Sequence, residues 1–226
     1  MKVSVIVPAL NEAGVIEETL KSAVDAFEVI VADGGSLDGI LQRAARCGAK
    51  VISTRAGRPS RGRQMDAGAD ASSGDALLFL HADSILPEGW AGMVKAALAD
   101  DGVVAGAFSL SIVSDRRIFR VIEAAVNFRA SRLGLIYGDQ AIFARREAFL
   151  NCGGFNKLPL MEDVDCVKRL RKFGRVVVLK DRVKTSARRW EKNGVARSTL
   201  RNWLVLLLWF IGVSPARLYG IYYAQE

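Results

Sequence analysis

Short apolar runs alternate with helix-length segments over the first hundred residues of this chain, and this alternation restricts the possible folds more than any other feature. The runs are rich in β-branched residues and are bounded by Gly, Pro or Asp, as are strands buried on both faces of a sheet. The pattern predicts strands at 3–7, 29–32, 51–53 and 76–80, and helices at 15–26, 38–47, 61–71 and 90–99. Such a series is typical of an α/β fold with a doubly wound, mostly parallel sheet flanked by helices.

The second half of the chain is less regular. Residues 103–112 alternate in polarity as a strand does, 116–132 has helical spacing, and short strands at 141–144 and 176–179 enclose a helix at 163–172. The chain has 226 residues, half of them hydrophobic, which suffices for one substantial core. We therefore expect a single α/β domain over 1–200 and an apolar, aromatic tail at 201–226 that belongs to the same unit.

Polar residues follow three of the expected strands, at 8–12, 33–36 and 81–84. The carboxyl ends of parallel strands meet at one edge of an open sheet, where ligands bind, so these loops are expected to converge on one crevice. The sequence has neither Gly-x-Gly-x-x-Gly after the first strand nor a Walker lysine motif. The two commonest nucleotide-binding fingerprints are therefore absent.

Two acidic positions are candidates for chemistry at this edge. Asp83 follows the strand at 76–80, where a carboxylate can hold a divalent cation against a phosphate. Glu162 and Asp163 come about eighty residues later, at the expected start of a helix. One acid at a strand tip and one at a helix start favour separate roles in metal–phosphate binding and proton removal. Acids at a helix start also interact well with the helix dipole, and this structural explanation stays open.

The positive charge of the chain is concentrated in one segment. The formal net charge is +8, and residues 166–201 contain thirteen Lys and Arg but only two acids, so that segment carries +11 and the remainder −3. Such a block indicates an anionic partner, which could be phosphate, anionic lipid or nucleic acid, or else a solvated surface.

The cysteines and the N-terminus bear on location. Cys47, Cys152 and Cys166 are odd in number and lack metal-ligand spacing, which favours a reducing compartment over a disulfide framework. The N-terminus runs directly into a strand, and no signal peptide is expected. We expect a cytoplasmic protein, with peripheral attachment to the inner face of the membrane as an open alternative.

Several stretches of the sequence, taken in order, resemble the signatures of the family 2 glycosyltransferases, which have the GT-A (Rossmann-like) fold. The stretches are 5–12, 31–39, 62–71, 74–83, 138–140, 153–155 and 161–165. The resemblance covers about 3–190 and is closest to small bacterial, non-processive members. It implies a GT-A domain with a donor half at about 1–112 and an acceptor half at about 113–200.

The resemblance implies a nucleotide-sugar site in the donor half. The matching residues are Pro8, Glu12, Asp33, Arg61, Arg63, His81 and Asp83. Carboxylates accept hydrogen bonds from uracil N–H groups or ribose hydroxyls, and the arginine fork suits phosphate oxygens. Asp83 matches the last acid of the family's Asp-x-Asp motif, which implies that it binds Mg²⁺ or Mn²⁺. His81 replaces the first acid and could bond the ribose, a phosphate or the metal.

The resemblance also implies an acceptor site. Asp163 matches the catalytic base, which removes the proton from an acceptor hydroxyl as that oxygen attacks the anomeric carbon, with inversion. Glu162, Arg189 and Trp190 are the implied acceptor-binding residues. Processive members carry Gln-x-x-Arg-Trp where this chain has Ser186 in place of Gln. The expected activity is therefore inverting, non-processive transfer of one sugar from a nucleotide-diphosphate sugar, with a UDP-sugar favoured, to an acceptor hydroxyl.

The tail contains an unbroken apolar run of eleven residues at 203–213. A membrane-spanning helix needs roughly 20 such residues, so this run is too short to cross a bilayer. Together with the basic segment before it, the run indicates an amphipathic helical tail that contacts a membrane surface or a lipid-linked acceptor. A helix buried against the sheet and a homodimer contact are the alternatives.

Two other functions would explain part of the sequence. A nucleotidyltransferase of related fold would begin with a Gly-rich loop and a basic residue after the first strand, and 8–12 has neither. A basic module that binds membranes or nucleic acid, with a degenerate metal site, would explain the +11 segment. The acids at the strand tips would repel phosphate unless a cation intervened, so no nucleic-acid partner is expected.

Overall fold

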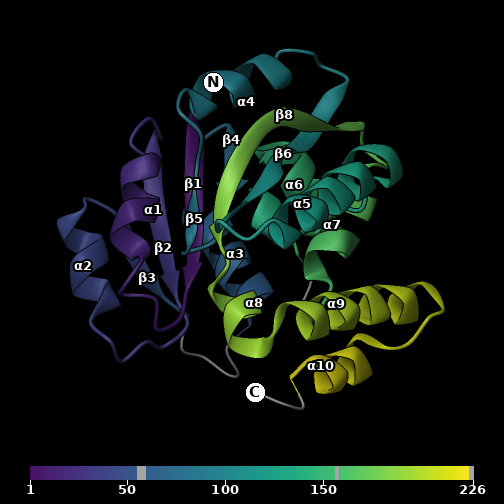
Figure 1. Ribbon diagram of the computed structural model, residues 1–226. Coiled ribbons are helices and arrows are strands. Elements are labelled where there is room, and N and C mark those ends of the chain that lie inside the picture. Colours follow the sequence, from purple (N-terminus) through teal and green to yellow (C-terminus); the bar gives the residue numbers. More distant parts are fainter. Residues whose placement is uncertain (55–59, 156–157, 224–226) are drawn as a thin grey trace.

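The computed structural model describes residues 1–54, 60–155 and 158–223 of the chain. Within these residues the chain forms one eight-stranded sheet in the order β3-β2-β1-β4-β7-β6-β8-β5, flanked by helices (Figure 1). The first half comprises β1 (Val3–Ala9), α1 (Ile16–Ser22), β2 (Glu28–Asp33), α2 (Ile40–Arg46), β3 (Lys50–Ser53), α3 (Arg61–Asp70), β4 (Ala76–Phe79), β5 (Ser84–Ile85) and α4 (Trp90–Ala97). The expected α/β fold is confirmed.

The second half contains more elements than the sequence predicted. It comprises β6 (Val103–Val113), α5 (Ile118–Phe128), β7 (Phe143–Arg145), α6 (Arg146–Asn151), α7 (Glu162–Leu170), β8 (Arg175–Ser186), α8 (Arg188–Asn193), α9 (Val195–Phe210) and α10 (Pro215–Tyr223). A π-helical turn at Arg129–Leu133 continues α5, and a 3₁₀ turn lies at Gly138–Gln140. The helix expected at 116–132 is thus present, α6 and α8 are additional, and the expected helical tail consists of two separate helices, α9 and α10.

The strand directions are mixed in the second half of the sheet. β1 pairs in parallel with β2 and β4, β2 pairs in parallel with β3, and β6 pairs in parallel with β8. β7 lies antiparallel between β4 and β6, and the short strand β5 pairs antiparallel with β8. The sheet is mostly parallel, as expected. The direction of β7 depends on how its connections cross the sheet and could not be predicted from the residues of the strand itself.

β8 is much longer than the strand expected at 176–179. It runs for twelve residues, and its register with β6 breaks where Phe108 pairs with Leu179 while Ser109 pairs with Arg182. Lys180 and Asp181 therefore form a bulge in the strand. The charged residues at 180–184, which made this segment hard to recognise as a strand, are exposed because only one face of this part of the sheet is covered.

Apolar cores cover both faces of the sheet. On one face the side chains of β1 and β4 that include Val5 and Leu78 pack with residues of α1, α2, α4 and α5. On the other face Phe79 packs with Phe149 of α6 and with Phe155, at centroid distances of 4.9 and 4.7 Å. This two-sided burial explains why the strands of the first half are apolar at successive positions.

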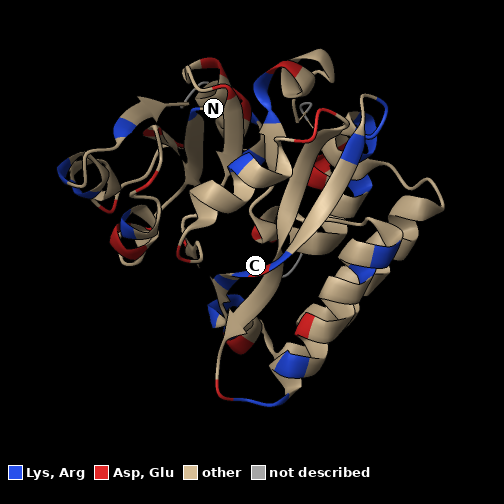
Figure 2. Ribbon diagram, turned by 90° about the horizontal axis from the view of Figure 1, so that it is seen from above, with Lys and Arg blue, Asp and Glu red and all other residues tan. Residues whose placement is uncertain are grey.

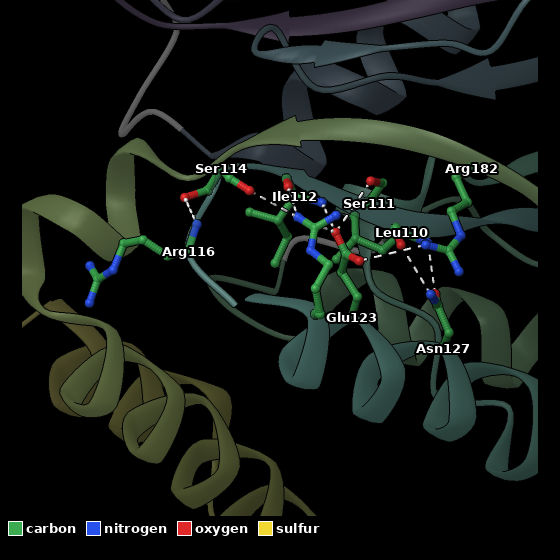
Figure 3. A network of polar contacts seen from close by, with 9 residues as sticks. Leu110, Ser111, Ile112, Ser114, Arg116, Glu123, Asn127 and Arg182 are labelled. Atoms are coloured by element: carbon green, nitrogen blue, oxygen red, sulfur yellow. Dashed lines mark hydrogen bonds and ion pairs between the residues drawn. The ribbon is translucent and has the colours of Figure 1, made fainter. Parts of the chain in front are cut away.

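A polar network fixes α5 against β6. The buried carboxylate of Glu123 accepts hydrogen bonds from the Ile112 backbone N–H and from Ser111 Oγ (Figure 3). It also forms ion pairs with Arg120 at 3.0 Å and Arg182 of β8 at 3.6 Å. Because these partners satisfy the carboxylate, its burial is tolerated, and α5, β6 and β8 are held together.

The basic segment at 166–201 is spread over several elements. Lys and Arg are distributed around the molecule with Asp and Glu between them (Figure 2). Among the described residues, four cations of the segment form ion pairs with acids outside it. These pairs are Arg169–Asp165, Arg175–Asp100, Arg182–Glu123 and Arg188–Glu12. Part of the +11 charge is therefore neutralised by ion pairs within the fold.

The C-terminal helices α9 and α10 pack on each other and on α7. Val205 and Leu206 of α9 and Leu218 of α10 are buried together with Met161 and Val164. α9 begins at residue 195 and crosses the expected boundary between 200 and 201, while 224–226 lie outside the described residues. No helix in the described part of the chain has the length and apolar character needed to cross a membrane.

Candidate active site

A large cleft opens at the carboxyl ends of β1 and β4, with a cavity volume of about 710 Å³. The start of α3, the start of α7, the end of β8 and the C-terminal helices form its walls. In Figure 1 the helices α8, α9 and α10 lie at the bottom of the view. β1 runs toward this side, so these helices lie near the edge of the sheet where β1 ends. The cleft is lined by nine of the residues expected in the site: Pro8, Glu12, Arg61, His81, Asp83, Glu162, Asp163, Arg189 and Trp190.

Asp33 and Arg63 are not among the residues that line the cleft. Asp33 is fully buried at the end of β2, and its carboxylate accepts hydrogen bonds of 3.0 Å from the N–H groups of Gly35 and Ser36. It therefore shapes the loop after β2. Arg63 is exposed on α3, two positions after Arg61, because neighbouring positions on a helix face different directions.

Gln64 is a cleft residue that the sequence analysis missed. It lies three positions after Arg61 and so shares its helix face. Its Nε2 donates hydrogen bonds to the carbonyls of Ala9 at 2.7 Å and Ala32 at 2.9 Å, which ties the ends of β1 and β2 together. Gln64 could have been predicted to line the cleft, because it is a polar residue one helical turn after an arginine that is a candidate phosphate ligand.

The first two strand-end loops are joined by Asn11. Its backbone N–H donates to Ser36 Oγ at 2.8 Å, and its Oδ1 accepts from the Leu37 N–H at 2.9 Å. Asn11 has a φ of 54°, a conformation that asparagine adopts more readily than most residues. The adjacent Glu12 is ion-paired with Arg188 of α8. The loop therefore links β1 to the opposite wall of the cleft.

His81 and Asp83 follow β4 and line the cleft together. Burial lowers the pKa of His81 well below its usual value, and the positive charges of Arg61 and Arg189 lower it further. The imidazole is therefore neutral near pH 7, so one ring nitrogen can accept a hydrogen bond or ligate a metal. His81 Nε2 is buried without a hydrogen-bond partner among the described residues.

Asp163 is held at the start of α7 by the backbone. Its Oδ2 accepts a hydrogen bond of 2.7 Å from the Gly138 N–H, and its Oδ1 accepts one of 2.7 Å from the Val164 N–H. Met161, just before this pair of acids, has a φ of 66°. Backbone strain of this kind is often found at functional sites.

Glu162 lies buried beside Asp163. Burial raises the pKa of Glu162 to about 7, and the neighbouring Asp163 carboxylate contributes in the same direction, while Arg61 opposes the shift. Glu162 therefore exchanges its proton near neutral pH, and in its protonated form it can donate a hydrogen bond into the cleft.

Asp139 is a second residue that the sequence analysis did not single out. It lines the cleft after Gly138, and its Oδ1 is buried without a partner among the described residues. Burial raises the pKa of Asp139 to about 6, and the charges of Asp163 and Asp83 add to the effect. It belongs to the stretch 138–140 that resembles a family signature, but its proximity to Asp83 depends on the fold.

The side chains of the cleft supply some, but not all, of the oxygen ligands that a hard divalent cation needs. The described residues contain no cluster of three or more His, Cys, Asp or Glu that could by itself hold a metal ion. Mg²⁺ is usually bound by one or two carboxylates together with substrate phosphates. Asp83, with the partnerless carboxylate oxygen of Asp139 nearby, fits a site of that kind.

The C-terminal helices form one wall of the cleft. Ser198, Arg201 and Asn202 of α9 and Tyr219 and Tyr222 of α10 line it. The Arg201 guanidinium lies 4.3 Å from the centroid of the Tyr222 ring and donates to the Tyr222 carbonyl at 3.1 Å. A tail buried against the sheet was one alternative offered by the sequence, but nothing in the sequence indicated that polar residues of the tail line the candidate site.

The architecture is that of the GT-A glycosyltransferases: a mostly parallel sheet with an acid-lined cleft at its carboxyl edge. Comparison with known families agrees. The family model described as Glycosyl transferase family 2 matches residues 4–159, and the chain belongs to this family.

Individual relatives are more distant. Glucosyl-3-phosphoglycerate synthase of Mycobacterium tuberculosis (strain ATCC 25618 / H37Rv) is 38% identical over 96 residues, which cover 38% of this chain and 30% of that protein. A crystal structure of the M. tuberculosis enzyme with Mn²⁺, UDP and glucosyl-3-phosphoglycerate aligns with a TM-score of 0.55 at 25% identity, covering 82% of this chain and 70% of that one. S. aureus TarS 1–349 in complex with UDP-GlcNAc aligns with a TM-score of 0.66 at 21% identity, covering 82% and 58%. The chain spans about a third of the length of the curated relatives it matches.

Proposed function

We propose that this protein transfers one sugar, with inversion, from a nucleotide-diphosphate sugar to an acceptor hydroxyl. The observation that carries the proposal is that Asp83 and Asp163, which are far apart in the sequence and come from different elements, line the same cleft. Family membership makes sugar transfer the reaction that these two acids would serve.

A UDP-sugar is the favoured donor. The relatives support this choice, because the M. tuberculosis synthase was crystallised with UDP and S. aureus TarS with UDP-GlcNAc. In this chain Pro8, Glu12, Arg61 and His81 would contact the nucleotide and diphosphate, and Asp33 would support them by fixing its loop. Arg63 stays a prediction, since it lies on the exposed side of α3.

The proposed cofactor is Mg²⁺ or Mn²⁺, held by Asp83 with Asp139 nearby. The M. tuberculosis relative holds Mn²⁺. When bound, the ion would neutralise charge on the diphosphate leaving group. Within the protein, the positive charge of Arg61 would attract the same phosphates. Neutral His81 would supply a nitrogen for hydrogen bonding without adding a positive charge that repels the cation or Arg61.

Asp163 is the proposed base. Its two backbone hydrogen bonds fix the carboxylate, and each oxygen keeps a further lone pair for a proton. The acceptor oxygen forms a bond to the anomeric carbon while the bond to the diphosphate breaks, its electron pair leaves with the diphosphate, and the hydroxyl proton passes to Asp163. A single displacement of this kind inverts the configuration at the anomeric carbon.

The acceptor would bind on the side of the cleft formed by Glu162, Arg189 and Trp190. Trp190 is half-buried, its ring lies 6.1 Å from that of Phe119, and the residue lines the cleft. Ser186 replaces the glutamine of the processive motif, which supports transfer of a single sugar. A lipid-linked acceptor, membrane contact through 201–226 and a homodimer remain predictions from the sequence.

Calorimetric titration tests the donor site directly. The purified protein would be titrated with UDP and with GDP, each in Mn²⁺ and in EDTA. The proposal expects UDP to bind in Mn²⁺ and to bind at least tenfold more weakly in EDTA. Tighter binding of GDP would reject the UDP-sugar, and no nucleotide binding in any condition would reject the donor site.

A further inference from the structure

The outer side of α9 exposes a continuous apolar stripe. Leu200, Trp203, Leu204, Leu207 and Phe210 are 69, 52, 47, 59 and 61% exposed, and Ile211 just after the helix is 69% exposed. Their spacing of three, one, three, three and one places them on one face of the helix. The opposite side is occupied, because Val205 and Leu206 are buried in the fold. The stripe is therefore a second apolar face without a cover in the described chain.

A hollow lies at the C-terminal end of this stripe. It has a volume of about 370 Å³, and Phe210 belongs both to the stripe and to its lining. Leu135, Trp209 and Val213 give it apolar walls, and Lys168 and Arg171 of the α7 end give it two cations. None of the described residues that line it is acidic. An apolar hollow rimmed by cations suits a molecule with an anionic head and an apolar body.

The two C-terminal helices that carry this face have charges of one sign. From residue 192 to 225 the sequence contains one lysine and three arginines but no Asp or Glu. Arg197 in the first turn of α9 and Arg217 of α10 are exposed. Long basic side chains can lie along apolar surface and extend their charge to lipid headgroups.

We propose that this face, formed by the α9 stripe and the hollow beside it, binds the surface of an anionic membrane. A second copy of the chain is the competing occupant. Copies joined through this face would bring the arginines of α9 and α10 together with no carboxylate in 192–225 to pair with them. Anionic headgroups supply the missing negative charge, and the acyl boundary takes up Trp, Leu and Phe side chains. The inference does not depend on the proposed sugar transfer.

Vesicle sedimentation tests the proposal on the full chain. Binding is measured to phosphatidylcholine vesicles and to vesicles of phosphatidylcholine with about a third phosphatidylglycerol. The wild-type chain is expected to bind the anionic vesicles at least tenfold more tightly. The variant Trp203→Ser/Leu207→Ser is expected to lose about tenfold or more in binding, since each buried CH₂ contributes roughly 0.8 kcal/mol. Val24→Ser/Leu150→Ser removes exposed apolar side chains elsewhere, 80 and 47% exposed, and is expected to bind as the wild type does.

The charge is tested separately. Lys168→Glu/Arg171→Glu should weaken binding to anionic vesicles about tenfold or more, because each basic residue near such a surface contributes roughly 1 kcal/mol. The control Arg46→Glu/Lys95→Glu makes the same change in net charge on α2 and α4, away from the face, and should bind far better than the first variant. Thermal unfolding of each variant checks that the fold is kept.

Three results would overturn the proposal. The first is failure of the wild-type protein to sediment with anionic vesicles. The second is sedimentation of the stripe variant as complete as that of its control. The third is a dimer, seen by sedimentation equilibrium, that Trp203→Ser/Leu207→Ser converts to monomer without vesicle binding by the wild type; this would assign the face to a second copy. Nucleotide binding is measured by calorimetry on the same samples, so failure of the donor site and failure of the membrane face are distinguished.

Discussion

The backbone N–H of Gly138 donates a hydrogen bond of 2.7 Å to the carboxylate of Asp163, across twenty-five residues of sequence. The same glycine lies against His81, because a Cβ built on Gly138 would stand 2.9 Å from His81 Nε2 and 3.5 Å from Asp163 Oδ2. Gly138 therefore sits between the proposed base and the histidine beside the proposed metal ligand. The site needs a residue without a side chain at this position.

Replacing Gly138 tests this packing. Gly138→Ala should displace His81 or the Asp163 carboxylate and reduce kcat/KM for transfer by about tenfold or more, since misplacement of catalytic groups by even 1 Å can cost about a hundredfold. Gly14→Ala is the control, because a Cβ there meets nothing within 4 Å. Steady-state kinetics and thermal unfolding would be compared. Equal kinetics for the two variants would contradict the proposed arrangement.

The two acids should fail in different ways. Asp163→Asn should lower kcat by roughly 10²–10⁴-fold, the usual contribution of a positioned base, while UDP still binds. Asp83→Asn should abolish the gain in UDP affinity that Mn²⁺ provides. Asp165→Asn, which breaks the ion pair with Arg169 on the same helix, should keep transfer within a few-fold of wild type. Turnover by Asp163→Asn at the wild-type rate would reject the assigned base.

Glu162 should make stability depend on pH. Its pKa is raised from 4.5 to about 7 by burial and by Asp163, so between these pH values the folded state binds more protons than the unfolded state. The free energy of unfolding therefore falls as pH rises from 4.5 to about 7, and the stability present below pH 4.5 is lost. Asp66 and Asp139, with pKa values raised to about 6, act in the same direction.

Glu162→Gln isolates this contribution. The amide does not ionise, so the variant should lose less stability than the wild type between pH 5 and pH 8. Urea unfolding at both pH values would measure the difference. Identical losses in the two proteins would show that the Glu162 pKa is not raised in the folded state.

Two helical glycines should respond oppositely to alanine. A Cβ on Gly68 of α3 would stand 2.3 Å from Cγ2 of Ile6 in β1, so Gly68→Ala should lower the free energy of unfolding by about 1–3 kcal/mol. Gly92 of α4 has nothing within 4 Å of such a Cβ, and Gly92→Ala should raise it by about 0.5–1 kcal/mol. Chemical unfolding measures both changes. Equal effects would contradict the close contact of α3 with β1.

The Glu123 network should contribute more to the free energy of unfolding than its exposed ion pairs suggest. Glu123→Ala leaves the Ile112 N–H without its acceptor and two arginines without their shared carboxylate, and should cost about 2–4 kcal/mol. Arg182→Ala removes only the 3.6 Å pair, whose arginine side chain is 56% exposed, and should cost less than about 1 kcal/mol. Urea unfolding compares the two. A smaller loss for Glu123→Ala would mean that the network does not anchor α5.

The sequence by itself determined the first half of the fold and led to two acids, Asp83 and Asp163, that line the cleft. β1, β2 and β4 could be predicted because each is a largely buried apolar run, and local composition reports burial. β3 lies at the edge of the sheet and is less buried, but its short apolar pair still marked it. Asp83 and Asp163 could be chosen because each stands at the end of an element beside a recognisable signature. Asp83 reaches the cleft because parallel strands end at a common edge of the sheet, whereas Asp163 reaches it because α7 begins beside the Gly138 turn.

Only the tertiary structure decided the length of β8, the direction of β7 and the far wall of the site. The length of β8 was hidden by its charged residues, because a strand covered on one face need not be apolar. The direction of β7 follows from the path of the chain across the sheet. Gln64, Asp139 and Arg201 reach the cleft through contacts between segments distant in sequence. Local patterns report which residues are buried, whereas long-range packing decides which residues meet.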